Sequence, residues 1–89
     1  MPYIPQDERK IINDQMKQLL DQASELTDGQ INYIISNLIN THIQATTLNY
    51  AKLNAMIGVL ECAKLELYAR MITPYESTKI QQNGGLYER

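Results

Sequence analysis

Apolar residues recur at three- and four-residue spacing along most of the chain, and this period predicts helices. The first helix is expected over residues 5–26, with a charged opposite face, and the second over residues 30–45. The longest, residues 48–72, carries apolar side chains on more than one side. The pattern therefore predicts an all-α bundle of three main helices, with the third at its centre.

Prolines and a glycine mark where the first two helices begin. Residues 1–6 form an extended lead-in, because Pro2 and Pro5 push the residues before them away from helical angles. Pro5 also suits the first turn of the first helix. Asp28 and Gly29 then break the chain and offer an N-cap for the second helix. We expect the second helix to begin directly after them.

Pro74 is expected to break or kink the long helix, because it removes one backbone hydrogen bond to the preceding turn. The residues around it also fit the start of a new helix. Thr73, Pro74 and Glu76 fit an N-cap, a proline at the first helical position and the glutamate of a capping box. The short C-terminal helix that they predict would end before Gly84, which can adopt the left-handed conformation of a helix stop. Residues 85–89 would then form a loose tail.

Length and composition indicate a single helical domain over residues 1–89. A chain of 89 residues builds a modest core, so association with a second chain would help to stabilise it. The formal charge of −2 and the lack of a basic block argue against nucleic-acid binding. The chain has one cysteine, and no apolar run approaches the length needed to cross a membrane. Residues 1–10 are polar and do not resemble a signal peptide, so none is expected. We expect a cytoplasmic protein.

Small side chains form a strip along the long helix, which predicts close packing against another backbone. A glycine in mid-helix costs about 1 kcal/mol relative to alanine, so it usually has such a packing reason. A helix that is apolar nearly all round is buried in a larger core or shared with a second chain. We therefore expect a homo-oligomer, most simply a homodimer. It would use the uncharged face of the second helix or the strip, whose members are Ala51, Ala55, Gly58, Cys62 and Ala69.

Two ionisable residues inside the long helix are candidates for chemistry. Glu61 and Lys64 lie in its most apolar part, and active-site acids are made by burying a carboxyl group. The simpler interpretation is an ion pair at the edge of the core or across a subunit interface, since the two are three residues apart. His42 lies in an apolar stripe, which predicts a hydrogen-bonded core histidine. Antiparallel packing of the second and third helices would keep it about 12 Å from Glu61, so a dyad of the two would need a different topology or a dimer mate.

Two further functional classes stay open as alternatives. A magnesium-dependent nucleotide pyrophosphohydrolase would suit the helical architecture, but it needs clustered carboxylates, and the long helix offers only Glu61 and Glu66. A DNA-binding regulator would need a basic face, which the sequence lacks. No nucleotide-binding or zinc motif occurs, so no cofactor or metal is predicted. The sequence favours a protein without enzymatic activity.

Several segments together carry a resemblance. They are residues 1–6, Leu48-Asn49-Tyr50, GVLECAKLELYAR from Gly58, Pro74-Tyr75-Glu76, Lys79-Ile80 and Asn83-Gly84. In these the chain resembles a family of small uncharacterised proteins of phages, environmental sequences and some bacteria, although Gly85 stands where an acidic residue is expected. The resemblance implies a phage-type origin and a shared helical design, and it supplies no catalytic residues to carry over. A phage-encoded protein would act in the host cytoplasm, where we expect a phage or host protein as a further partner. We predict a non-enzymatic interaction or accessory protein that acts as a homo-oligomer.

Overall fold

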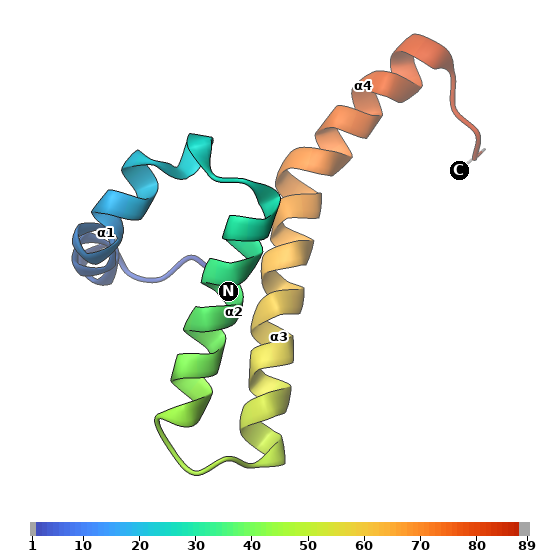
Figure 1. Cartoon of the computed structure of the whole chain (residues 1–89). Coiled ribbons are helices and arrows are strands. Elements are labelled where there is room, and N and C mark those ends of the chain that lie inside the picture. Colours follow the sequence, from blue (N-terminus) through green and yellow to red (C-terminus); the bar gives the residue numbers. More distant parts are fainter. Residues whose placement is uncertain (1, 88–89) are drawn as a thin grey trace. The chain divides into compact units, whose positions relative to one another are not determined.

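The computed structural model describes residues 2–87, which form helices joined by short connections (Figure 1). No strand occurs among these residues. The predicted all-α fold, with three main helices and a short C-terminal one, is confirmed. In chain order the elements are α1 (Gln6–Asp21), the 3₁₀ turn η1 (Ala23–Glu25), α2 (Asp28–Gln44), α3 (Tyr50–Leu67), the π-helical turn η2 (Tyr68–Ile72) and α4 (Thr73–Asn83).

Two compact units divide the chain, and the division falls within α3. Unit 1, Met1–Met56, holds α1, η1, α2 and the first turns of α3. Unit 2, Ile57–Arg89, holds the rest of α3, η2 and α4. The single domain over residues 1–89 stays a prediction.

The N-terminal lead-in is attached to α1 through Arg9. Its guanidinium donates from Nε to the carbonyl oxygen of Ile4 at 2.7 Å and lies 5.9 Å from the centroid of the Tyr3 ring. Pro5 is the N-cap, with extended backbone angles, and not part of the first turn as predicted. Two acidic residues occupy that first turn, where their negative charges stabilise the helix by interacting with the positive end of its dipole.

A capping box fixes the start of α2. The Thr27 hydroxyl accepts the backbone N–H of Gln30 at 3.1 Å, and the Gln30 side-chain oxygen accepts the backbone N–H of Thr27 at 2.9 Å. Two backbone donors that a helix start leaves without partners are thereby satisfied. The prediction of an N-cap at Asp28 and Gly29 is wrong, because Asp28 is already the first helical residue.

A side-chain cap also fixes the start of α3, after the connection formed by residues 45–49. The side-chain oxygen of Asn49 accepts the backbone N–H of Lys52 at 2.9 Å. The Lys52 ammonium group donates to the hydroxyl of Thr46 and to the carbonyl oxygen of Thr47. The helix therefore begins at Tyr50, two residues later than expected.

In unit 2, helical backbone continues through Pro74 by way of η2. Proline has no N–H, and in a regular α-helix its ring would collide with the carbonyl of Arg70, four residues earlier. The π turn widens the helix at this point, and the N–H of Thr73 bonds to the carbonyl oxygen of Tyr68. Thr73 itself has helical angles (φ −58°, ψ −47°), so its prediction as the N-cap of a separate helix is wrong.

Gly84 ends α4 with a positive φ, as predicted. Its angles are φ 88° and ψ 149°, a region that glycine enters without the steric cost of a Cβ, although ψ lies outside the left-handed helical range. Its N–H donates to the carbonyl oxygen of Ile80 at 2.8 Å. Residues 85–87 follow without helical structure, and the last two residues of the expected tail lie outside the described part.

No side chain within residues 2–87 is buried. The apolar stripes of the helices, which were expected to form a core, are exposed to solvent. Leu20 is 51% exposed and Leu38 is 70% exposed. His42 is exposed as well, so its prediction as a core histidine is wrong. The helices thus form as their periodicity predicts, while their apolar faces stay open to another surface.

Candidate interaction surface

An apolar groove lies between α1 and α2 within unit 1. One part encloses about 280 Å³ and shares Met16, Leu19 and Ile34 with a second part of about 530 Å³, which reaches Leu38 and Thr41. No charged side chain lines either part. We call this the α1–α2 groove; its apolar lining includes Met16, Leu19, Leu20, Ile31, Ile34, Ile35 and Leu38.

Helical periodicity places these residues in the groove. Met16, Leu19 and Leu20 recur at three- and four-residue spacing on the apolar side of α1, whose other side is charged. The same spacing gathers Ile31, Ile34, Ile35 and Leu38 on one side of α2. The sequence therefore predicts both faces. It could not predict that they would line one groove and remain open, because the period does not reveal what each face contacts.

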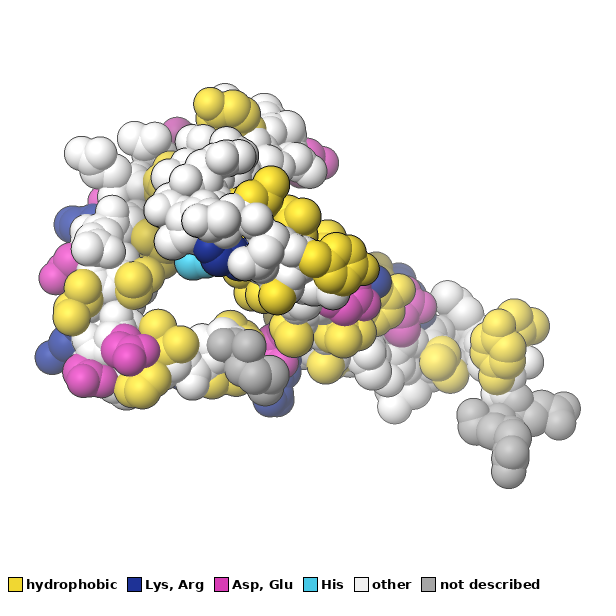
Figure 2. Space-filling view, turned by 90° about the horizontal axis from the view of Figure 1, so that it is seen from below, with side chains coloured by type: hydrophobic (Ala, Val, Ile, Leu, Met, Phe, Trp, Pro, Cys, Tyr) yellow, Lys and Arg dark blue, Asp and Glu magenta, His cyan; other side chains and the backbone are white. Residues whose placement is uncertain are grey.

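Solvent-exposed apolar side chains are the main chemical feature of this surface. Figure 2 shows hydrophobic side chains at many places on one side of the molecule. In the α1–α2 groove most of the large ones are 37–70% exposed. Such a groove can bind an apolar surface by excluding water, which stabilises a contact by about 25 cal/mol per Å² of apolar area.

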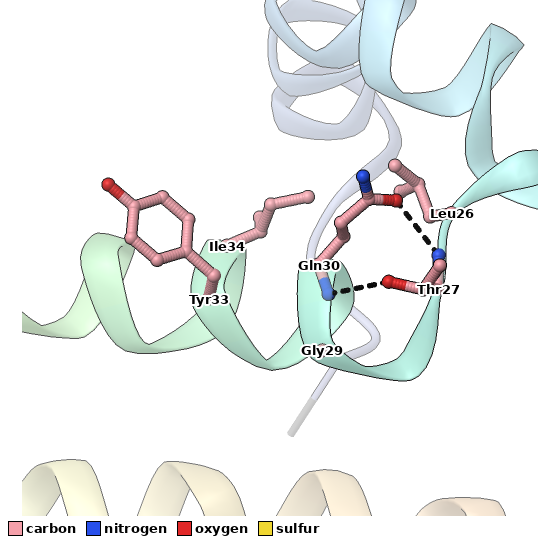
Figure 3. A pocket seen from close by; sticks show the side chains of 6 residues that line it. All are labelled: Leu26, Thr27, Gly29, Gln30, Tyr33 and Ile34. Carbon is pink, nitrogen blue, oxygen red and sulfur yellow. Dashed lines mark hydrogen bonds between the residues drawn. The ribbon is translucent and has the colours of Figure 1, made fainter.

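Another hollow, of about 450 Å³, adjoins the start of α2 and contains the capping box (Figure 3). Thr27 and Gln30 bond to one another there, so these polar groups already have partners. The rest of the lining is Leu26, Gly29, Tyr33 and Ile34. The motif Thr27-Asp28-Gly29-Gln30 fits the capping-box pattern and is the signal by which the sequence could have located this helix start.

The five predicted interface candidates on α3 and η2 are all exposed; they are Ala51, Ala55, Gly58, Cys62 and Ala69. A Cβ added at Gly58 would meet no atom within 4 Å. Close backbone packing at Gly58 therefore does not occur within this chain, and packing against a second copy stays a prediction. The thiol of Cys62 is free and exposed.

Glu61 and Lys64 form an ion pair with each other. The Lys64 ammonium nitrogen lies 3.1 Å from a carboxylate oxygen of Glu61, and their side chains are 61% and 52% exposed, respectively. A pair this open to solvent contributes about 0.2–1 kcal/mol. The structure thus brings the two weak catalytic candidates together, but at the surface and without the buried environment that would set apart an active-site acid.

The remaining carboxylate of α3, Glu66, accepts a hydrogen bond from Nε of Arg70 at 2.9 Å. In unit 1, the carboxylate of Asp21 pairs with the ammonium group of Lys17 at 3.1 Å. Across the described residues, no group of three or more His, Cys, Asp or Glu side chains comes together in a way that could hold a metal ion. The carboxylate cluster that the pyrophosphohydrolase alternative requires is therefore not found in residues 2–87.

The chain belongs to the family described as a domain of unknown function, DUF6899, whose model matches residues 1–86. The match covers all of unit 1 and unit 2 as far as Leu86. No curated protein and no solved structure is similar to the chain. Among the helices of the described part, none combines the length and the apolar character needed to cross a membrane.

Proposed function

We propose that the protein is a non-enzymatic interaction protein that acts as a homo-oligomer, most simply a homodimer. One observation carries the proposal: residues 2–87 contain no buried side chain, while large apolar side chains from every main helix are exposed. Isolated helices are marginal in water, and most helical stability in proteins comes from packing an apolar face. A second copy would supply the packing partner.

The exposed apolar area is large enough to drive association. Fully burying one large apolar side chain stabilises by about 1.5–3 kcal/mol, so covering one that is half exposed contributes about 1 kcal/mol. Ten such side chains per copy would contribute about 10 kcal/mol from each partner. The loss of translational and rotational freedom costs about 4–15 kcal/mol, which two copies together offset.

The resemblance to phage proteins supports the cellular part of the proposal. We propose that the protein is encoded by a phage and works in the cytoplasm of the host. A phage or host protein would bind the apolar surface that self-association leaves open.

Light scattering on the full chain tests self-association. We expect a mass of at least twice 10.2 kDa in the high micromolar range. Leu38→Asp should lower that mass, because it places a charge on a 70% exposed apolar position. Asn40→Asp is the matched control, since it adds the same charge to the opposite side of α2. A well-folded monomer at that concentration would overturn the proposal.

A further inference from the structure

We infer that the α1–α2 groove of one copy holds the apolar side of α3 from a second copy, with the stretch from Leu53 to Leu60 as the occupant. The inference rests on the proposed function and specifies which surfaces meet. It assigns an intermolecular role to a groove whose lining comes from α1, η1, α2 and Leu26, which follows η1.

The shape of the α1–α2 groove indicates which surface of a second copy could fill it. The α1–α2 groove is concave, so a second copy of the same groove would not fill it, whereas a single helix is convex. The apolar faces of α1 and α2 already line the groove, and α4 is mostly polar. Among the described helices, α3 carries apolar side chains on all sides. It is therefore the helix of this chain that can enter the groove with an apolar face.

The absence of charged side chains from the groove lining indicates which stretch of α3 could enter it. The groove lining contains no charged side chain, so a charged residue placed there would lose its water without gaining a partner. The eight residues from Leu53 to Leu60 contain no charged residue, and they are followed by the Glu61–Lys64 ion pair. This stretch is about 12 Å long, a little more than two helical turns. Leu53, Ile57 and Leu60 lie on one side of it.

The area matches what a stable dimer needs. On this side of α3, Leu53 is 41% exposed, Ile57 65% and Leu60 40%. Six large groove side chains are 37–70% exposed: Met16, Leu19, Leu20, Ile31, Ile35 and Leu38. At roughly 80 Å² each, the nine side chains would supply roughly 700 Å² per copy. A standard stable interface takes roughly 800 Å² from each partner, so mutual insertion of α3 would approach that size.

Cross-linking between two kinds of chain tests the contact, starting from Cys62→Ser to remove the one native thiol. One chain carries Lys64→Cys, beside the proposed occupant, and the other carries Asn37→Cys at the groove. The two full chains, one of them tagged, are unfolded together, refolded and treated with a short bis-maleimide. We expect a cross-linked product that contains both chains. A chain with Lys10→Cys, on the charged side of α1, replaces the groove chain as the control and should give little product.

Other outcomes separate this inference from the proposed function. Equal yields with the groove chain and the Lys10→Cys control, or no yield from a protein that light scattering shows to be dimeric, would overturn the inference alone. A single chain that carries both Lys64→Cys and Asn37→Cys reports whether its own α3 enters the groove. If it cross-links only internally and its mass is that of a monomer, the inference and the proposed function both fail.

A matched pair of substitutions on α3 gives an independent readout. Ile57→Asp places a charge on the side proposed to enter the groove, whereas Val59→Asp places the same charge on another side of α3. We expect Ile57→Asp to raise the dimer dissociation constant at least roughly tenfold more than Val59→Asp, which is about 1.4 kcal/mol. Equal effects of the two substitutions would overturn the assignment of this side.

Discussion

The capping box of α2 gives the sharpest prediction about a single residue. Thr27→Ala removes the hydroxyl that accepts the Gln30 N–H at 3.1 Å, while the second bond of the box, from the Thr27 N–H to the Gln30 side chain, can persist. Loss of a threonine N-cap costs about 1 kcal/mol. For a domain of this size, 1 kcal/mol lowers the melting temperature by about 4–8 °C. Thermal unfolding followed by circular dichroism measures that shift.

Asp28→Ala is the matched control, because the sequence pattern by itself predicts the N-cap at Asp28 and Gly29. In the structure Asp28 is the first helical residue, and its negative charge stabilises the helix by about 0.3–1 kcal/mol through its interaction with the positive end of the helix dipole. Salt screens this interaction. At high salt we therefore expect Asp28→Ala to melt close to the native protein, while the loss from Thr27→Ala remains. If Asp28→Ala were the more damaging change at high salt, our assignment of the cap to Thr27 would be wrong.

Three further changes test other parts of the account. Gly58→Leu should leave helix formation intact, because a Cβ at this position meets no atom within 4 Å in the same chain. If the backbone of a second copy packs closely there, the substitution should lower the mass of the oligomer. An unchanged melting temperature and an unchanged mass would refute such packing. Pro74→Ala should raise the free energy of unfolding by about 1–3 kcal/mol and convert η2 to regular α-helix, as chemical shifts would report; a persistent π turn would show another cause. Glu61→Gln should cost less than about 1 kcal/mol in chemical denaturation, because its ion pair with Lys64 is exposed; a larger loss would place the pair in a buried contact.

The helices were predictable from the sequence because local forces determine them. The three- and four-residue spacing of Met16, Leu19 and Leu20 is enough to specify a helix with one apolar side. Helix ends were less predictable, because caps depend on which of several adjacent polar residues bonds to the backbone. Thr27 and Asp28 are both good N-caps, and the deciding partner is Gln30, three residues after Thr27.

The contacts of those helices were not predictable, because an apolar stripe does not specify its partner. The same reasoning that identified the helix containing His42 expected that residue inside a core, and in the structure it is exposed. The Thr73 N-cap failed for a related reason. A proline usually ends a helix, because it lacks the N–H that would donate to the preceding turn. Here the π turn at Tyr68–Ile72 changes the hydrogen-bond spacing before Pro74, and the helical backbone continues.

Helix content and molecular mass measured together over a dilution series test the central claim most directly. If the exposed apolar faces of the described residues are covered by a second copy, folding and association are linked and stability depends on protein concentration. We predict a mass of at least twice 10.2 kDa at high concentration, with the melting temperature falling as the protein is diluted. A mass of 10.2 kDa and a melting temperature that stay constant over the whole series would contradict the account.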